Sequence, residues 1–218
     1  MYEEFANTYR NASVHCVRNE RYAETGSMYT LHQAQNEIDS PFLLLESDLL
    51  YEPRALVSLL HLRSDDDCVI LASGFTNSGD EVYLETGTGG LLRNLSKDRT
   101  QLRSVDAELV GVSRVGPATV RAMCGFMEQR DEGPKLSYED VFAAIAAAQP
   151  IRVLKIEDLV WCEIDDAAQL ERAQTRIVKA LDNLDTHNRL AGGHQGVGAH
   201  WGNEIANSTF SDGIVNAA

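Results

Sequence analysis

The chain has 218 residues, of which 44% are hydrophobic, enough to fill the core of one large domain or two small ones. Its 33 acidic residues outnumber 19 basic ones, and the formal charge of -14 disfavours a nucleic-acid backbone as a partner. The four cysteines stand far apart without a CxxC pair, which argues for reduced thiols in a cytoplasmic protein and against zinc. No apolar run approaches the ~20 residues that a membrane crossing needs.

The first third of the chain alternates helical patterns with short apolar runs, which is typical of an α/β protein. The run Phe42–Leu45 is uninterrupted and bounded by turn formers, as in a strand buried on both faces of a parallel sheet, and it ends in Glu46-Ser47-Asp48. Ser27 is placed to cap the helix that follows it. In chain order we expect the end of a helix at 2–10, a strand at 14–17, a helix at 27–37, a strand at 42–45, a helix at 53–62 and a strand at 68–72.

The remainder begins with short segments and glycine turns, which indicate a β-rich insertion between residues 77 and 90. Residues 187–218 are rich in Gly and Asn without a hydrophobic period, so we expect one domain over 1–186 and a flexible tail. The other elements expected are a strand at 109–115, a helix from 117, an Ala-rich helix at 138–148, strands at 153–156 and 159–161, and a helix at 166–184.

Two carboxylates stand at the carboxyl ends of predicted strands. Asp48 follows the strand at 42–45, and Asp165 follows the apolar segment that ends in Trp161-Cys162-Glu163-Ile164. Ligands of open parallel sheets bind outside the carboxyl ends of the strands, so these two residues can converge on one site. A pair of carboxylates suits Mg²⁺, although Asp at a strand end also serves simply to cap a turn.

Three further features are candidate binding residues. Thr25-Gly26-Ser27 precedes a predicted helix, where free N–H groups and a hydroxyl can bind a phosphate or a base edge, or where the serine is an ordinary cap. Lys97 lies in a basic stretch of an acidic chain and either meets an anionic substrate or faces the solvent. Tyr22 is one of several aromatic residues that either wall a pocket for a cationic amine or belong to the core.

Four segments in the same order resemble one family, the bacterial phosphocholine and 2-aminoethylphosphonate cytidylyltransferases, which are nucleotidyltransferases of the GT-A type. The resemblance covers roughly residues 10 to 180, and the order of the four segments is more specific than any one of them. The segments are Asn19–Leu31, Phe42–Asp48, Glu108–Ser113 and Trp161–Asp165.

The resemblance implies a Rossmann-like α/β fold with a mixed, mainly parallel sheet and flanking helices. It also implies that Asp48 and Asp165 hold Mg²⁺ on the triphosphate of CTP and act in catalysis, and that Thr25-Gly26-Ser27 faces the pyrimidine base. The reaction would join CMP to a small phosphonate or phosphate such as 2-aminoethylphosphonate and release pyrophosphate. Lys97, Tyr22 and Glu108 are the residues that we expect at this acceptor substrate.

The chain departs from the family at its beginning. Family members start with a strand and a Gly-rich loop of the form LAAGxGxR, and no such segment is found in these 218 residues. We therefore expect an N-terminally incomplete domain, with possible fusion to or association with an aminotransferase. A non-catalytic ligand-binding or partner-dependent module is the alternative, and a sugar-1-phosphate nucleotidyltransferase ranks below both.

Overall fold

The computed structural model describes residues 14–62, 65–191 and 214–216, so the helix end expected at 2–10 lies outside it. Seven strands form one sheet, in which β5, β4, β6, β1 and β9 are neighbours in that order, and β3 pairs with both β6 and β7. The strands of this sheet are β1 (Phe42–Leu45), β3 (Cys68–Ser73), β4 (Tyr83–Thr86), β5 (Leu92–Ser96), β6 (Ala107–Val115), β7 (Arg152–Ile156) and β9 (Ile214–Asn216).

A second, two-stranded sheet pairs β2 (Leu49–Tyr51) with β8 (Trp161–Glu163) in antiparallel fashion. The α-helices are α2 (Ser27–Ala34), α3 (Arg54–Leu60), α4 (Pro117–Glu128), α5 (Tyr138–Ile145), α6 (Ala167–Arg172) and α7 (Val178–Ala191). The shorter helical turns are η1 (Gln35–Glu37), η2 (Thr88–Gly90), η3 (Arg99–Gln101), η4 (Gly133–Lys135) and the π turn η5 (Ala173–Ile177).

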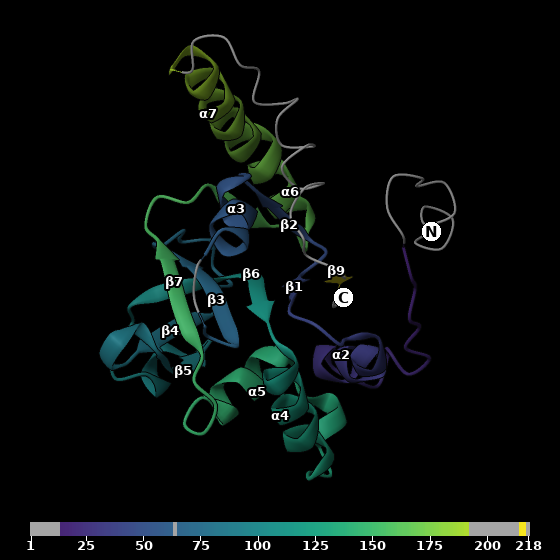
Figure 1. Ribbon diagram of the computed structural model, residues 1–218. Coiled ribbons are helices and arrows are strands. Elements are labelled where there is room, and N and C mark those ends of the chain that lie inside the picture. The colour runs from purple at the N-terminus through teal and green to yellow at the C-terminus, as the bar shows by residue number, and fades with distance from the viewer. Residues whose placement is uncertain (1–13, 63–64, 192–213, 217–218) are drawn as a thin grey trace.

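Both faces of the large sheet are covered by helices, which explains why β3 is buried along its whole length. Alternate residues of a strand point to opposite faces. Ile70 accordingly packs in the core that α2, α4 and α5 cover, whereas Val69 and Leu71 pack with residues of α3 on the other face. Figure 1 shows α3 on the opposite side of these strands from α4 and α5.

The sheet is mixed, as predicted. β1 pairs in parallel with β9, and β3 with β7, but β6 runs antiparallel to β1, β3 and β4. The share of parallel pairs is therefore smaller than the uninterrupted apolar runs predict. An apolar run shows that both faces of a strand are buried, and here helices bury both faces of antiparallel strands as well.

Two local predictions are wrong. Residues 14–17 form no strand, and Val14 and Val17 are exposed. Gly26, rather than Ser27, is the N-cap of α2, and the Ser27 hydroxyl instead accepts a hydrogen bond of 3.0 Å from the Tyr138 backbone N–H. A Cβ on Gly26 would lie 2.3 Å from the Leu136 carbonyl oxygen, so close packing against η4 and not helix capping dictates this sequence.

Part of the expected tail is in regular structure. Helix α7 continues to Ala191 and runs away from the body of the protein in Figure 1, and β9 lies beside β1. This pairing satisfies backbone groups of β1 that would otherwise form an open edge. Residues 192–213 and 217–218 of the expected tail lie outside the described part. Among the described helices, none has the length and apolar composition needed to cross a membrane.

Candidate active site

Two acidic segments meet at the carboxyl ends of β1 and β8. Glu46-Ser47-Asp48 follows β1 directly, and Glu163-Ile164-Asp165 begins at the last residue of β8. The pairing of β2 with β8 places Leu49 opposite Glu163, and the Ile164 N–H donates to the Asp48 carbonyl oxygen at 2.9 Å. Backbone pairing therefore holds the two segments side by side, although they are far apart in the sequence.

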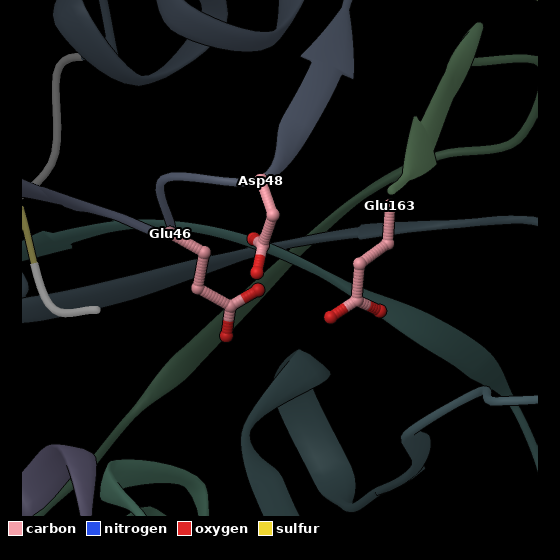
Figure 2. A group of neighbouring side chains, drawn as sticks. All are labelled: Glu46, Asp48 and Glu163. Atoms are coloured by element: carbon pink, nitrogen blue, oxygen red, sulfur yellow. The ribbon is translucent and has the colours of Figure 1, made fainter. Parts of the chain in front are cut away.

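The carboxylates of these segments form two overlapping clusters. Glu46, Asp48 and Glu163 each offer an oxygen within 4.8 Å of the others, and Figure 2 shows the three side chains pointing into the same space. Asp80, Glu163 and Asp165 form the second cluster under the same limit. Glu163 belongs to both clusters, so the two Asp residues predicted from the sequence are linked through it.

Asp48 has the strongest requirement for a further partner in these clusters. Its Oδ1 atom is buried and has no hydrogen-bond partner among the described residues. A buried carboxylate oxygen without a partner is costly, and proteins compensate for it with a hydrogen bond or a cation. A neighbouring carboxyl group can donate that hydrogen bond only while it holds a proton, and a bound cation would take the place of that proton.

Glu46 is held from two sides. The Tyr138 hydroxyl donates a short hydrogen bond to Glu46 Oε1. Gly111 has a φ of 78°, and a Cβ there would lie 2.1 Å from Glu46 Oε2. Gly111 also lies where the register of β6 against β3 shifts, so an irregularity in the strand opens the space that the carboxylate fills.

Burial, together with the neighbouring carboxylates, raises the pKa of three carboxyl groups in the site. Burial, together with Glu139, Glu163 and Asp48, raises the pKa of Glu46 to about 8, although the Tyr138 hydrogen bond opposes this shift. Burial and the charges of Asp165 and Asp48 raise the pKa of Glu163 to about 7. Burial raises the pKa of Asp165 as well. The cluster therefore holds protons near neutral pH that a bound cation would displace.

A cavity opens beside the clusters, between β8 and the loop that joins β3 to β4. Its walls include Glu46, Glu163 and Asp80, and its cationic lining residues are Lys97 and Arg172. Lys97 Nζ forms an ion pair of 2.7 Å with Asp80 Oδ1. The cavity thus combines many acidic groups with two positive charges, which suits a ligand that arrives with both a metal ion and phosphate groups.

The architecture is shared with solved enzymes of known reaction class. The inositol-1-phosphate CTP transferase from T. maritima superposes with a TM-score of 0.68 at 16% identity, over 83% of this chain and 71% of that chain. The CTP:phosphocholine cytidylyltransferase from Streptococcus pneumoniae superposes with a TM-score of 0.54 at 16% identity, over 76% of this chain and 67% of that chain. This chain has the fold of the nucleotidyltransferases.

A third nucleotidyltransferase structure, described as a glucose-1-phosphate thymidylyltransferase from Bacillus anthracis, matches with a TM-score of 0.58 at 10% identity, over 78% of this chain and 66% of that chain. The chain thus spans 66 to 71% of the length of these three structures. No protein-family model matches the sequence. At these identities the likeness concerns the fold, which confirms the resemblance to nucleotidyltransferases that the four segments indicated.

The predicted base-binding loop of this nucleotidyltransferase fold is engaged by the protein itself. The Gly26 N–H donates to the Pro134 carbonyl at 2.9 Å, and the Thr25 hydroxyl donates to the Arg21 carbonyl at 2.9 Å. With Ser27 bonded to Tyr138, the loop is fixed to the same residue that orients Glu46. Thr25, Gly26 and Ser27 are not among the lining residues of the cavity.

The three predicted substrate residues occupy different environments. Lys97 lines the cavity. Tyr22 is 77% exposed on a turn before α2 and does not line it. Glu108 is 1% exposed, and its carboxylate accepts a hydrogen bond of 2.8 Å from the Thr76 N–H. This burial leaves no surface for a substrate, so Glu108 instead anchors the loop that carries Thr76 and forms one wall of the cavity.

Sequence reasoning missed several acidic and basic residues of the site. Glu46 and Glu163 each stand two positions before the predicted Asp, and that repeated spacing is a signal that could have found them. Asp80 lies in the segment Asn77-Ser78-Gly79-Asp80, whose composition predicts a turn and gives no sign of a binding site. Arg172 lies in a helix whose charges look like an ordinary solvated face.

The donor set fits Mg²⁺. This ion takes oxygen ligands and is commonly held by one or two carboxylates together with waters and substrate phosphates. Glu163 supplies a carboxylate oxygen to both clusters, with Asp48 in one and Asp165 in the other, and the unpartnered Oδ1 of Asp48 is the atom most in need of a cation.

Proposed function

We propose that this protein is a CTP-dependent nucleotidyltransferase that joins CMP to a small phosphonate or phosphate with Mg²⁺. The observation that carries the proposal is the convergence of Asp48 and Asp165 around Glu163, beside a cavity that also holds two cationic side chains. Two of the structural neighbours are, by their descriptions, a CTP transferase acting on inositol-1-phosphate and a phosphocholine cytidylyltransferase. Both descriptions combine CTP with a small phosphorylated compound.

The reaction is an in-line displacement at the α-phosphorus of CTP. An oxygen of the acceptor's phosphonate or phosphate forms the new bond to that phosphorus, and the bond to the bridging oxygen of the β-phosphate breaks, so pyrophosphate leaves with the electron pair. Positioning and charge stabilisation provide most of the catalysis in such reactions. The protein therefore needs rigidly held carboxylates and cations more than it needs a nucleophile of its own.

The proposed roles follow the positions of the residues. Asp48 and Asp165 hold Mg²⁺, which when bound neutralises charge on the phosphates. Lys97 contacts the phosphate or phosphonate of a substrate. Thr25-Gly26-Ser27 faces the base of the nucleotide, which requires the loop to offer groups beyond those bonded to residues 134–138.

The test is product formation by the purified chain. CTP and Mg²⁺ are incubated with 2-aminoethylphosphonate, phosphocholine or inositol-1-phosphate, and ³¹P NMR follows the appearance of the diphosphate product and pyrophosphate. Glucose-1-phosphate with dTTP serves as the competing pair, because one structural neighbour is described as a thymidylyltransferase. We expect product with CTP and one of the first three acceptors. Turnover only with dTTP would contradict the choice of nucleotide.

The same samples address the alternative of a non-catalytic module. Calorimetric titration with CTP and Mg²⁺, and separately with each acceptor, measures binding in the absence of turnover. Binding of an acceptor without product in any combination would favour a binding or partner-dependent module over the enzyme. Association with an aminotransferase stays a proposal, and co-purification would test it.

A further inference from the structure

The cavity beside the acidic clusters is lined by an arginine that has a buried donor without an acceptor among the described residues. Arg172 is the last residue of α6 and lines the cavity together with Lys97. Its Nε atom is buried and has no hydrogen-bond partner among the described residues. A buried guanidinium donor without an acceptor carries a desolvation cost that an anionic ligand would remove.

The local structure directs Arg172 toward the site. Helix α6 begins at Asp166, whose side chain accepts from the Gln169 N–H in a capping box, so the start of the helix is fixed beside Asp165. Side chains of an α-helix lean toward its N-terminus, which turns a long side chain at the end of α6 back toward that point. The π turn η5 follows Arg172 directly, and π turns within helices often mark functional sites.

The two cations are paired differently. Lys97 Nζ forms an ion pair of 2.7 Å with Asp80 Oδ1. Among the described residues Arg172 forms no ion pair with a carboxylate, and its Nε has no hydrogen-bond partner, so it is not explained as compensation for the carboxylate clusters.

We propose that Arg172 and Lys97 together bind the phosphate or phosphonate group of a substrate in this cavity, which rests on the proposed function for the source of that group. The planar guanidinium donates two parallel hydrogen bonds to a tetrahedral oxyanion, and the ammonium adds a point charge. The Asp80 carboxylate is paired with Lys97 Nζ at 2.7 Å. A substrate anion therefore competes with Asp80 for the lysine and meets Arg172 without competition at Nε.

The test measures binding without catalysis, by calorimetry in the absence of metal. Inorganic phosphate and 2-aminoethylphosphonate are the probes, and we expect the Arg172→Gln variant to bind both about tenfold more weakly or worse, because one charged hydrogen-bonding partner is lost. Arg172→Lys keeps the charge without the planar fork and should lose less. The matched control is Arg176→Gln, since Arg176 is exposed on the next turn and does not line the cavity.

Asp80→Asn gives a readout that a merely structural role of Arg172 would not produce. Removing the competing carboxylate should strengthen phosphate binding roughly threefold, as expected for loss of an exposed ion-pair partner of Lys97. In the Arg172→Gln background this gain should be reduced, because the second anchor of the anion is gone. Thermal unfolding of each variant shows whether it is folded.

Titration with CTP and Mg²⁺ identifies the source of the bound group. If Arg172→Gln weakens binding of the phosphonate but not of CTP, the oxyanion bound by Arg172 and Lys97 belongs to the acceptor. If the variant weakens binding of both, the triphosphate of CTP also contacts these two residues. Phosphate and phosphonate binding that is undetectable in the parent, or equal in the parent and folded Arg172→Gln, overturns the inference. A parent that binds phosphonate through Arg172 but makes no nucleotide product would contradict the proposed function alone.

Discussion

The two acidic segments of the site share one pattern, a Glu two residues before an Asp, but the protein holds them differently. Glu46 is locked between the Tyr138 hydroxyl and Gly111, and Asp48 has a buried oxygen. Asp165 is exposed and is fixed mainly through its backbone, whose N–H donates to Gln169 Oε1. The first segment is thus preorganised by the core, and the second by a helix cap at the surface.

This difference bears on what each segment can contribute. A carboxylate whose position is set by the core needs little reorganisation when it binds a cation. An exposed carboxylate can move with the substrate. We infer that the β1 segment fixes the position of the metal and that the β8 segment adjusts to the nucleotide. Variants in each segment can break or sharpen this comparison.

The largest effect is expected from Asp48→Asn. The neutral amide binds a cation more weakly than the Asp48 carboxylate does. Turnover should therefore fall by about a hundredfold or more, as it does when an enzyme loses one preorganised electrostatic group. Asp165→Asn should cost less, because water can replace an exposed ligand. Steady-state rates at several Mg²⁺ concentrations measure both losses, with the exposed Asp39→Asn as control. Equal losses in the two variants would remove the distinction between the segments.

The next effect concerns the support of Glu46. Gly111→Ala places a Cβ against the Glu46 carboxylate and forces a residue with a side chain to keep a φ of 78°. We expect the free energy of unfolding to fall by about 1–3 kcal/mol, measured by denaturant titration. The control is Gly125→Ala in α4, where a Cβ meets nothing within 4 Å and helix propensity predicts a gain of about 0.5–1 kcal/mol. A loss of the same size in both variants would argue against the special position of Gly111.

These contacts show which parts of the site a sequence can predict. The position of Asp48 and of Asp165 after a strand predicts that the two lie near one another. The sequence does not predict that the antiparallel pairing of β2 with β8 brings them together. The contact of Gly111 with Glu46 depends on a register shift in β6, and that of Tyr138 depends on how α5 packs. Such tertiary contacts leave no local pattern in the chain.

The fold, like the site, has some features that local sequence predicts and others that depend on distant residues. The spacing of apolar residues along the chain predicts helices, and uninterrupted apolar runs predict strands, because both patterns depend only on neighbouring residues. The direction of β6 and the pairing of β9 with β1 depend on distant partners. The strand expected at 14–17 shows the converse, because β-forming residues without a neighbouring strand remain irregular.

The pH dependence of stability in this cluster is expected to be of the same order, over one pH unit, as the effect of Gly111→Ala. The folded-state pKa values of Glu46, about 8, and Glu163, about 7, lie above the ordinary 4.5, so the folded protein keeps protons that the unfolded chain releases. In the absence of metal these groups should therefore contribute their full stability at and below about pH 4.5, and the free energy of unfolding should fall as the pH rises from there toward 8. The slope is at most ~1.4 kcal/mol per pH unit for each group.

Glu46→Gln should flatten this slope more than Glu163→Gln, because Glu46 has the larger shift and the more rigid surroundings. Denaturant titrations at four pH values between 5 and 8 measure the slope, with the exposed Glu171→Gln as control. Addition of Mg²⁺ should reduce the decline at high pH, because the cation replaces the protons. A stability that rises steadily over this interval in the parent, with the same slope in Glu46→Gln, would mean that the cluster is already ionised.

The smallest effects are expected from the helix caps behind each segment. Asp166→Ala removes the capping box of α6, and Ser137→Ala removes that of α5, so each should lower the free energy of unfolding by about 1 kcal/mol. Their functional effects should differ. The α6 cap fixes the backbone beside Asp165, so Asp166→Ala should weaken Mg²⁺ binding a few-fold, which calorimetry measures. Ser137→Ala should leave Mg²⁺ binding unchanged, because Tyr138 is held by the core as well as by its helix. If Ser137→Ala weakened Mg²⁺ binding more than Asp166→Ala, the β1 segment would be the adjustable one.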